Sequence, residues 1–174
     1  MDSNIFLLGY MCSGKTSVAK HLANKMSVKH IDLDDEIQKS KKSSISELFE
    51  KFNEIGFRNI ENKMLNKILK KETNSVISLG GGTPCYYDNM KKVCLSTKNV
   101  FYLKSTNKIL ANRLFNSRAD RPLISRIDNI ESMLEFVSKH MFERSNFYEM
   151  AHYKINTVNK GIEQISNQIK SIIH

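Results

Sequence analysis

The 174-residue chain contains little cysteine and no long apolar segment. Its three cysteines, Cys12, Cys85 and Cys94, are odd in number and form no CxxC pair, which argues against a disulfide framework or a zinc site. No apolar run approaches the length of a membrane-spanning helix. The N-terminus also lacks a basic region followed by a long apolar run, which a secretory signal would have. We therefore expect a cytoplasmic protein with reduced thiols and no membrane contact.

Acidic residues are outnumbered, since 27 basic side chains face 18 acidic ones and the formal charge is +9. Such an excess can favour nucleic acids or small phosphorylated anions. The lysines are scattered, however, and no aromatic-rich basic stripe accompanies them. We therefore interpret most of them as solvated surface and expect no nucleic-acid partner. The chain also lacks internal repeats and a proline-rich linker, and its length suits a single domain over residues 1–174.

Short apolar runs alternate with amphipathic stretches along the chain. The expected strands cover residues 5–8, 28–31, 75–79, 100–103 and 153–156. The expected helices cover residues 14–26, 57–70, 105–116 and 130–148, with one further helix opened by a capping box of Ser44 and Glu47 and another at the C-terminus. This alternation predicts an α/β fold, a three-layer sandwich with a central parallel five-stranded sheet. Ligands in such folds bind beyond the carboxyl ends of the strands, where Gly9, Asp32 and Gly80 fall.

Residues 9–16 match the phosphate-loop pattern G-x-x-x-x-G-K-[ST], with an expected strand before them and an expected helix after them. The glycines allow successive backbone N–H groups to point at phosphate oxygens, and the helix N-terminus adds positive charge. Lys15 would reach the β- and γ-phosphates, and the Thr16 hydroxyl would help to hold Mg²⁺. The alternative is a chance glycine-rich turn. The strand–loop–helix context favours nucleotide binding.

Two acidic residues and three glycines follow other strands. Asp32 and Asp34 are two residues apart, so in an extended chain they would face the same way, one toward a metal and the other toward a substrate hydroxyl. An acid-rich helix N-terminus explains them equally well. The consecutive glycines at positions 80–82 suggest close approach to a ligand or an unusual turn.

Three arginines are candidates for binding anionic groups: Arg58, Arg121 and Arg144. Singly, each is typical of a surface ion pair, and Arg58 with Glu61 has the spacing for one. Phosphoryl transfer needs cationic groups around the γ-phosphate, and a carboxylated substrate would need an arginine fork. Periodicity does not show whether the three arginines meet.

As an ordered set, these motifs resemble the shikimate kinases, within the nucleoside-monophosphate-kinase-like P-loop fold. The matching segments extend from residue 5 to about 157 and read GYMCSGKT, IDLDDEI, SISELFEKFNEIGFRNIE, VISLGGG, RADRPLI and FERSNFYEMA. The resemblance implies ATP-dependent phosphorylation of the 3-hydroxyl of shikimate, giving shikimate 3-phosphate and ADP in aromatic amino acid biosynthesis. It also implies Mg²⁺ as cofactor, ATP and shikimate as the partners of a monomer, and a mobile lid.

The resemblance assigns a role to each matched position. The implied catalytic residues are Lys15, Asp34 and Arg121. The implied ATP-binding residues are Cys12, Ser13, Gly14, Lys15, Thr16, Ser17, Arg113 and Arg121. The implied substrate-binding residues are Asp34, Arg58, Gly80, Gly81, Gly82 and Arg144, and the implied Mg²⁺-binding residues are Thr16 and Asp32. The substrate-binding region would span about residues 32–62, and the lid about residues 112–124.

Three positions depart from the family, which often has glycine where this chain has Cys12, Lys42 and Asn53. We expect that Cys12 does not need a positive φ, and Asn53 tolerates the left-handed region. Two other functions stay open on the residues alone. One is a gluconate or nucleoside-monophosphate kinase, which would not require Asp34, Arg58 and Arg144 together. The other is a nucleotide-binding regulatory or RNA-binding module.

Overall fold

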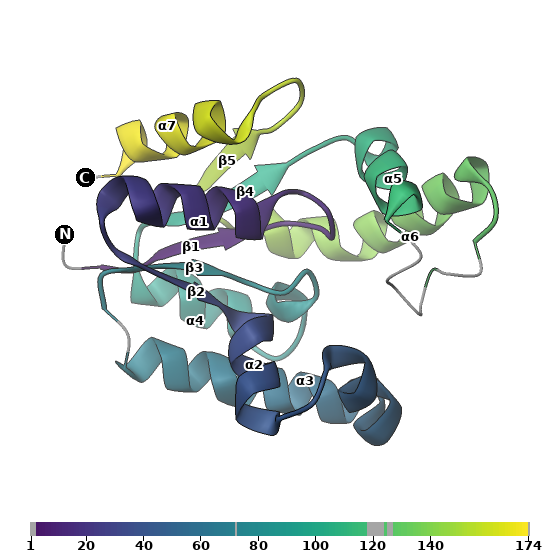
Figure 1. The fold of residues 1–174 in the computed structure, drawn as a ribbon, viewed down its shortest axis with the longest axis horizontal. Coiled ribbons are helices and arrows are strands. Elements are labelled where there is room, and N and C mark those ends of the chain that lie inside the picture. The colour runs from purple at the N-terminus through teal and green to yellow at the C-terminus, as the bar shows by residue number, and fades with distance from the viewer. Residues whose placement is uncertain (1–2, 72, 118–123, 125–126, 174) are drawn as a thin grey trace.

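The computed structural model describes residues 3–71, 73–117, 124 and 127–173. Arg121 and residues 118–123 of the expected lid lie outside these residues. Within them, five parallel strands form one sheet in the order β2-β3-β1-β4-β5 (Figure 1). The strands are β1 (Ile5–Leu8), β2 (Lys29–Asp32), β3 (Ser75–Ser78), β4 (Val100–Lys104) and β5 (Tyr153–Asn156). The expected parallel five-stranded sheet is therefore confirmed.

Both faces of the sheet are covered, as the continuous apolar sequence of β1 requires. Successive residues of a strand point to opposite faces, so Ile5 and Leu7 belong to one core cluster and Phe6 and Leu8 to the other. Helices α1 (Lys15–Met26) and α7 (Ile162–Ile172) cover the first face. Helices α3 (Ile45–Lys71), α4 (Asn89–Ser96) and α6 (Ile130–Tyr148) cover the second. The result is a three-layer sandwich (Figure 1).

Two pairs of helices flank the carboxyl edge of the sheet. Helix α2 (Leu33–Lys41) packs against α3, and α5 (Asn107–Asn116) packs against α6. In Figure 1 these two pairs lie on opposite sides of the loop that joins β1 to α1. None of the helices in the described ranges combines the length and the apolar character that crossing a bilayer would need.

Helix α2 starts directly after β2, so the extended interpretation of Asp32 and Asp34 is wrong. Asp32 is the N-cap, and its Oδ1 atom accepts hydrogen bonds from the backbone N–H groups of Asp34 (3.0 Å) and Asp35 (3.4 Å). These bonds satisfy donors that have no partner inside the helix. The alternative of an acid-rich helix N-terminus is therefore confirmed. Sequence analysis also did not anticipate α4 or the short 3₁₀ helix η1 (Thr83–Cys85).

Helix α3 contains a break that divides it into the two helices expected there. The backbone at Asn53 is non-helical, with φ 54° and ψ −174°, and its Oδ1 atom accepts from the Gly56 N–H at 3.1 Å. Asn53 therefore caps the second segment. The first segment begins with the expected capping box, in which the Glu47 N–H donates to Ser44 Oγ (3.2 Å) and the Ser44 N–H donates to Glu47 Oε2 (2.7 Å).

The three positions that depart from the family's glycine all have positive φ: 59° at Cys12, 51° at Lys42 and 54° at Asn53. The expectation that Cys12 does not need a positive φ is therefore wrong. The Ser13 N–H donates to the Tyr10 carbonyl at 3.2 Å and closes a four-residue turn with Cys12 in its third position. Several common turns require a positive φ there.

Lys42→Gly should stabilise the fold by about 0.5–1 kcal/mol. Lys42 is the left-handed C-cap of α2, a conformation that costs a residue with a side chain about 1–2 kcal/mol. The greater freedom of glycine in the unfolded chain offsets part of this gain. Urea unfolding measures the difference. Lys41→Gly, one residue earlier inside the helix, is the control and should be destabilising. A Lys42→Gly chain no more stable than the parent would contradict the account.

Candidate active site

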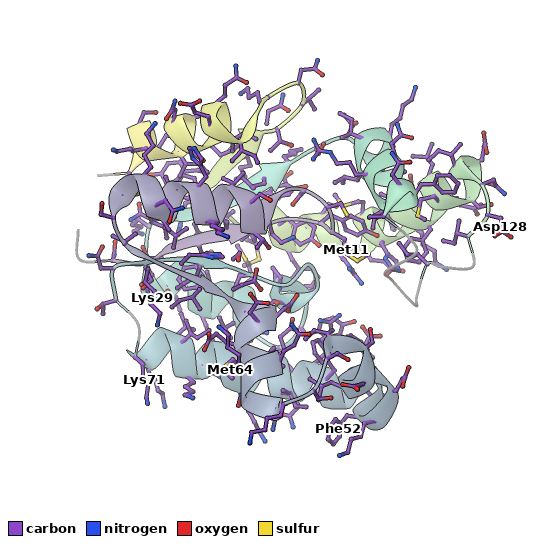
Figure 2. All side chains as sticks on the ribbon, in the orientation of Figure 1. Met11, Lys29, Phe52, Met64, Lys71 and Asp128 are labelled. Atoms are coloured by element: carbon purple, nitrogen blue, oxygen red, sulfur yellow. The ribbon has the colours of Figure 1, made fainter. Side chains whose placement is uncertain are left out.

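The loop between β1 and α1 requires glycine at two positions for different reasons. Gly14 has φ 95° directly before α1. Gly9 has φ 147°, and a Cβ atom there would lie 2.8 Å from the Leu103 carbonyl oxygen and 2.9 Å from Ser13 Oγ. In Figure 2, Met11 lies near the tip of this loop, with α2 and α3 on one side and α5 and α6 on the other. The loop and the N-terminus of α1 thus form the phosphate-binding arrangement that the motif predicts.

Two polar side chains of the loop are suited to a bound anion. Lys15 Nζ donates to the Tyr10 carbonyl at 2.9 Å, so its ammonium folds back over the loop. Ser13 is buried, and its Oγ atom has no hydrogen-bond partner within the described part of the chain. Because buried hydroxyls normally have a partner, this one fits a ligand oxygen.

Asp32 is held from two elements besides its own helix. Its Oδ2 atom accepts from Thr16 Oγ1 and from Ser78 Oγ, each at 2.8 Å. Ser78 Oγ lies in turn 3.2 Å from His30 Nε2. Burial lowers the pKa of His30 against the opposing charges of Asp32 and Asp35, which favours a neutral ring. The predicted metal residues, Thr16 and Asp32, are therefore in direct contact.

Asp34 lies in the first turn of α2 and is partly buried. Burial raises its pKa to about 6, helped by the negative charges of Glu61 and Asp32 and opposed by Lys15 and Arg58. A Cβ atom at Gly80 would lie 2.9 Å from Asp34 Oδ1 and also 2.9 Å from Glu61 Oε1. The first glycine of the run therefore allows two carboxylates to approach the backbone.

Arg58 forms the expected pair with Glu61, but the pair is buried rather than on the surface. Arg58 Nη1 donates to Glu61 Oε2 at 2.9 Å, and the side chains are 9% and 1% exposed. The guanidinium carbon lies 5.6, 5.3 and 4.5 Å from the ring centres of Phe49, Phe57 and Tyr86. Three rings therefore fix a guanidinium whose Nε atom has no partner among the described residues.

The glycine run links Asp34, the phosphate loop and Arg58. A Cβ atom at Gly82 would clash with the Arg58 guanidinium, so a side chain there would displace that guanidinium. A Cβ atom at Gly81 would lie 3.4 Å from the backbone nitrogen of Met11. The Gly81 carbonyl accepts from the Tyr148 hydroxyl at 2.6 Å, which connects the run to the end of α6.

Arg144 projects from α6 toward the phosphate loop. Its guanidinium carbon lies 5.9 Å from the ring centre of Tyr10, whose hydroxyl is 3.1 Å from His140 Nδ1, one turn earlier on the same helix. Burial raises the pKa of Cys85 to about 11, against the positive charges of both Arg144 and Arg58. The positive charges of the two predicted carboxylate-binding arginines, Arg58 and Arg144, therefore both influence Cys85.

The remaining predicted ATP-binding residues lie around the loop. Arg113 of α5 donates from Nη1 to the Cys12 carbonyl at 3.2 Å, and Cys12 Sγ lies 3.6 Å from Ser117 Oγ. Ser17 is exposed in the first turn of α1. Arg121 lies outside the described residues.

Sequence reasoning missed two partners of the site, Glu54 and Tyr86. Tyr86 donates its hydroxyl to Glu54 Oε1 at 2.7 Å, and Arg58 Nη2 lies 3.4 Å from the same oxygen. The spacing of Glu54 and Arg58, four residues apart on a helix, was a usable signal. Tyr86 lies four residues after the glycine run, and nothing in the sequence indicated its role.

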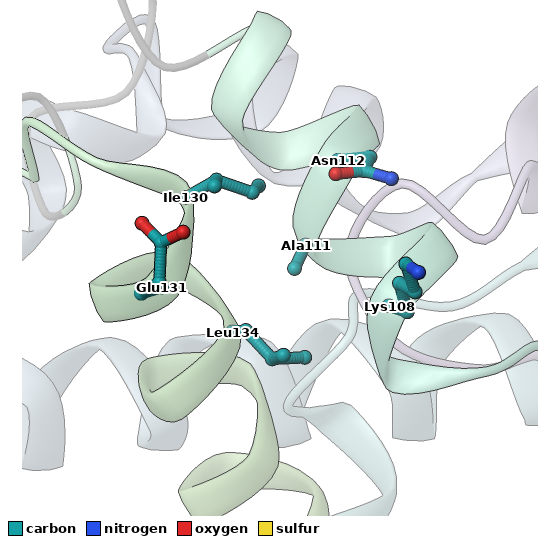
Figure 3. A pocket seen from close by; sticks show the side chains of 6 residues that line it. All are labelled: Lys108, Ala111, Asn112, Ile130, Glu131 and Leu134. Atoms are coloured by element: carbon teal, nitrogen blue, oxygen red, sulfur yellow. The ribbon is translucent and has the colours of Figure 1, made fainter.

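A separate pocket lies between α5 and α6 (Figure 3). Its lining residues are Lys108, Ala111, Asn112, Ile130, Glu131 and Leu134. None of them belongs to the predicted site, so we assign this pocket no role in the chemistry.

Comparison with known proteins agrees with this geometry. The family model for shikimate kinase matches residues 11–174. A shikimate kinase of Flavobacterium johnsoniae is 39% identical over 97% of this chain and 98% of its own length. The crystal structure of the Bacteroides thetaiotaomicron shikimate kinase superposes with a TM-score of 0.91 at 32% identity, covering 99% of this chain and 98% of that one. The Acinetobacter baumannii shikimate kinase in complex with shikimate gives a TM-score of 0.83 at 30% identity, covering 98% and 92%. The chain therefore belongs to the shikimate kinase family, as its motifs predict.

Proposed function

We propose that the chain transfers the terminal phosphoryl group of ATP to the 3-hydroxyl of shikimate, giving shikimate 3-phosphate and ADP. One observation carries the proposal: successive glycines of the run 80–82 lie against Asp34, against Met11 of the phosphate loop and against Arg58. The glycine run therefore brings together three proposed elements: the base Asp34, the phosphate loop and the carboxylate-binding Arg58. Shikimate carries a hydroxyl and a carboxylate, so it suits this arrangement.

ATP would bind through the backbone N–H groups of the loop, with Lys15 neutralising charge on the transferring phosphate. The residues assigned to it are Cys12, Ser13, Gly14, Lys15, Thr16, Ser17 and Arg113, with Arg121 from the lid. The buried Ser13 hydroxyl, which has no hydrogen-bond partner among the described residues, supports this assignment. Because phosphoryl transfer depends mainly on positioning and electrostatics, the loop would act by holding the phosphates in line with the acceptor.

Mg²⁺ is the cofactor that fits this site, where Thr16 and Asp32 would hold it. Their hydroxyl and carboxylate oxygens are the hard ligands that Mg²⁺ prefers, and Thr16 Oγ1 is 2.8 Å from Asp32 Oδ2. Asp32 Oδ2 already accepts a second hydrogen bond from Ser78, so we expect Asp32 to act through a metal-bound water. When bound, the metal would supply positive charge to the β- and γ-phosphate oxygens.

Asp34 is the proposed partner of the acceptor hydroxyl. With a pKa of about 6 it is ionised at neutral pH, yet more basic than an ordinary aspartate. A base whose pKa lies near the working pH combines the correct protonation state with a useful driving force for proton transfer. Its oxygen beside Gly80 would orient the 3-hydroxyl and receive its proton as the new bond to phosphorus forms.

We also propose one catalytic domain, working as a monomer, with a substrate-binding region over about residues 32–62 and a lid over about residues 112–124. The substrate-binding region contains three residues that lie close together, Asp34, Arg58 and Glu61. Their proximity supports grouping residues 32–62 as one region. The contact of Arg113 with the Cys12 carbonyl supports a lid that starts beside the phosphate loop.

Replacing Arg58 or Arg144, the two arginines assigned to the shikimate carboxylate, should weaken shikimate binding by about tenfold to hundredfold, with ATP affinity nearly unchanged. A charge-assisted hydrogen bond to the substrate carboxylate is worth about 1.5–3 kcal/mol, which gives this range. Arg144→Ala is the cleaner variant, since Arg58→Ala leaves the buried Glu61 unpaired. Arg144→Lys should restore binding only in part, because lysine lacks the planar fork.

Calorimetric titration of each variant with shikimate, and separately with ATP, measures these affinities. Thermal unfolding of each variant confirms that it is folded. If folded arginine variants bind shikimate as tightly as the parent, the substrate assignment fails, while the phosphate-loop assignment stands.

A further inference from the structure

One side chain at the substrate arginines is itself a carboxylate. Glu54 Oε1 accepts from Arg58 Nη2 at 3.4 Å and from the Tyr86 hydroxyl at 2.7 Å. The hydrogen bond from Tyr86 lowers the pKa of Glu54, and the positive charges of Arg58 and Arg144 add to this effect against partial burial. Glu54 is therefore ionised at neutral pH and feels both arginines that the proposed function assigns to the shikimate carboxylate.

Arg58 does not depend on Glu54 for its position. Its Nη1 atom is bound to the fully buried Glu61 at 2.9 Å, and the rings of Phe49, Phe57 and Tyr86 surround its guanidinium. The contact with Glu54 is longer, and the Glu54 side chain is 53% exposed. Such a half-exposed pair contributes little, so a stronger ligand can displace it.

Glu54 also lies where its side chain can leave without disturbing the helix. It directly follows the backbone break at Asn53, whose side chain caps the second segment of α3 through the Gly56 N–H. The cap therefore does not involve Glu54. Rotation of the Glu54 side chain would leave Arg58 Nη2 available to another carboxylate.

We infer that Glu54, held by Tyr86, is a resident carboxylate that occupies the carboxylate subsite of Arg58 and Arg144 in the ligand-free chain and is displaced by the substrate. This inference rests on the proposed function and deepens it. The resident carboxylate balances two neighbouring positive charges while the site is empty. Glu54 also favours shikimate over inorganic anions. An inorganic anion must compete with Glu54 for the arginines, whereas shikimate gains further contacts at Asp34 and the glycine run.

Tyr86 has two separable roles in this arrangement. Its ring centre lies 4.5 Å from the Arg58 guanidinium carbon, the shortest of the three ring distances, and its hydroxyl holds Glu54. Removing only the hydroxyl should release Glu54, whereas removing the ring should loosen Arg58. The two changes at one position therefore have opposite expected effects on shikimate affinity.

Calorimetric titration with shikimate tests the inference on the full chain. Glu54→Gln keeps the shape but removes the charge, and it should tighten shikimate binding about two- to fivefold, as loss of a half-exposed ion pair implies. Tyr86→Phe should tighten binding in the same direction, and Tyr86→Leu should weaken it. Glu50→Gln is the matched control, since Glu50 is exposed on the first segment of α3 and carries the same charge. It should leave the affinity unchanged.

The concentration of sulfate that inhibits the kinase reaction is a second measurement. A purely structural role of Glu54 would not change this concentration. Sulfate should inhibit Glu54→Gln at lower concentration than it inhibits the parent or Glu50→Gln, because the arginines are no longer shielded. If Glu54→Gln binds shikimate no more tightly than the parent, or if sulfate inhibits both equally, the resident-carboxylate role is wrong. If the parent itself does not bind shikimate, the proposed function fails instead, so the two failures are distinguishable.

Discussion

Replacing Asp34 by asparagine should lower kcat by about 10²–10⁴-fold while ATP still binds. The asparagine keeps the shape beside Gly80 but cannot receive the proton of the acceptor hydroxyl or orient it by charge. In the parent, kcat/KM with shikimate should rise as the pH increases through about 6, because the proposed base is the ionised form of Asp34. A steady-state pH profile and an ATP titration of both proteins measure these effects. Parental turnover in the variant would exclude Asp34 from the chemistry.

The same replacement should stabilise the fold at neutral pH. The pKa of Asp34 in the folded chain, about 6, is above its ordinary value of 3.8, so folding favours the protonated form. The stability that depends on this proton is complete below pH 4 and is lost as the pH rises through 6. Asparagine removes that loss, and the expected gain at pH 7 is on the order of 1–3 kcal/mol. Urea unfolding at pH 4 and pH 7 should show the advantage of the variant only at the higher pH.

Lys15→Ala should lower kcat/KM by about 10²–10³-fold or more without unfolding the chain. The ammonium lies over the loop at 2.9 Å from the Tyr10 carbonyl, and its loss would remove the positive charge that we propose neutralises the transferring phosphate. Lys15 is half-buried at the start of α1 and adds no apolar side chain to either core cluster, so we expect the fold to be preserved. Lys20→Ala, an exposed change on the same helix, is the matched control and should keep parental kinetics.

ADP release and thermal unfolding of the two lysine variants make the comparison. Near-parental activity in a folded Lys15→Ala chain would remove the basis for a phosphate-binding loop at residues 9–16. Equal losses in Lys15→Ala and Lys20→Ala would instead indicate a general effect of charge.

Sequence patterns correctly predicted those elements whose structure is determined by neighbouring residues. The run of apolar residues in β1 predicted a strand covered on both faces, and the pair of Ser44 and Glu47 predicted a helix start. Two interpretations of Asp32 and Asp34 stayed open, because only Leu33 and Ile37 of α2 are buried and its cap, Asp32, also has the position of a ligand at the end of a strand. The structure shows Asp32 as the helix cap, and in the proposed function the same carboxylate would also help to hold Mg²⁺.

Features that depend on distant segments could not be predicted from periodicity. Arg58 and Glu61 have the spacing of a surface pair, and burial follows only because rings from α3 and from the segment after the glycine run enclose the guanidinium. The approach of Arg144 to Tyr10 likewise joins α6 to the phosphate loop across the fold. The glycine run indicated close approach, but its partners were visible only in three dimensions.

The central claim is tested most directly by the acceptor that the chain phosphorylates. The purified chain with ATP and Mg²⁺ would be offered shikimate, gluconate and AMP in parallel, with ADP release recorded and the product position determined by phosphorus and proton NMR. The account predicts rapid ADP release with shikimate alone and a phosphate on its 3-hydroxyl. Faster turnover with gluconate or AMP, or phosphate on another shikimate oxygen, would contradict it.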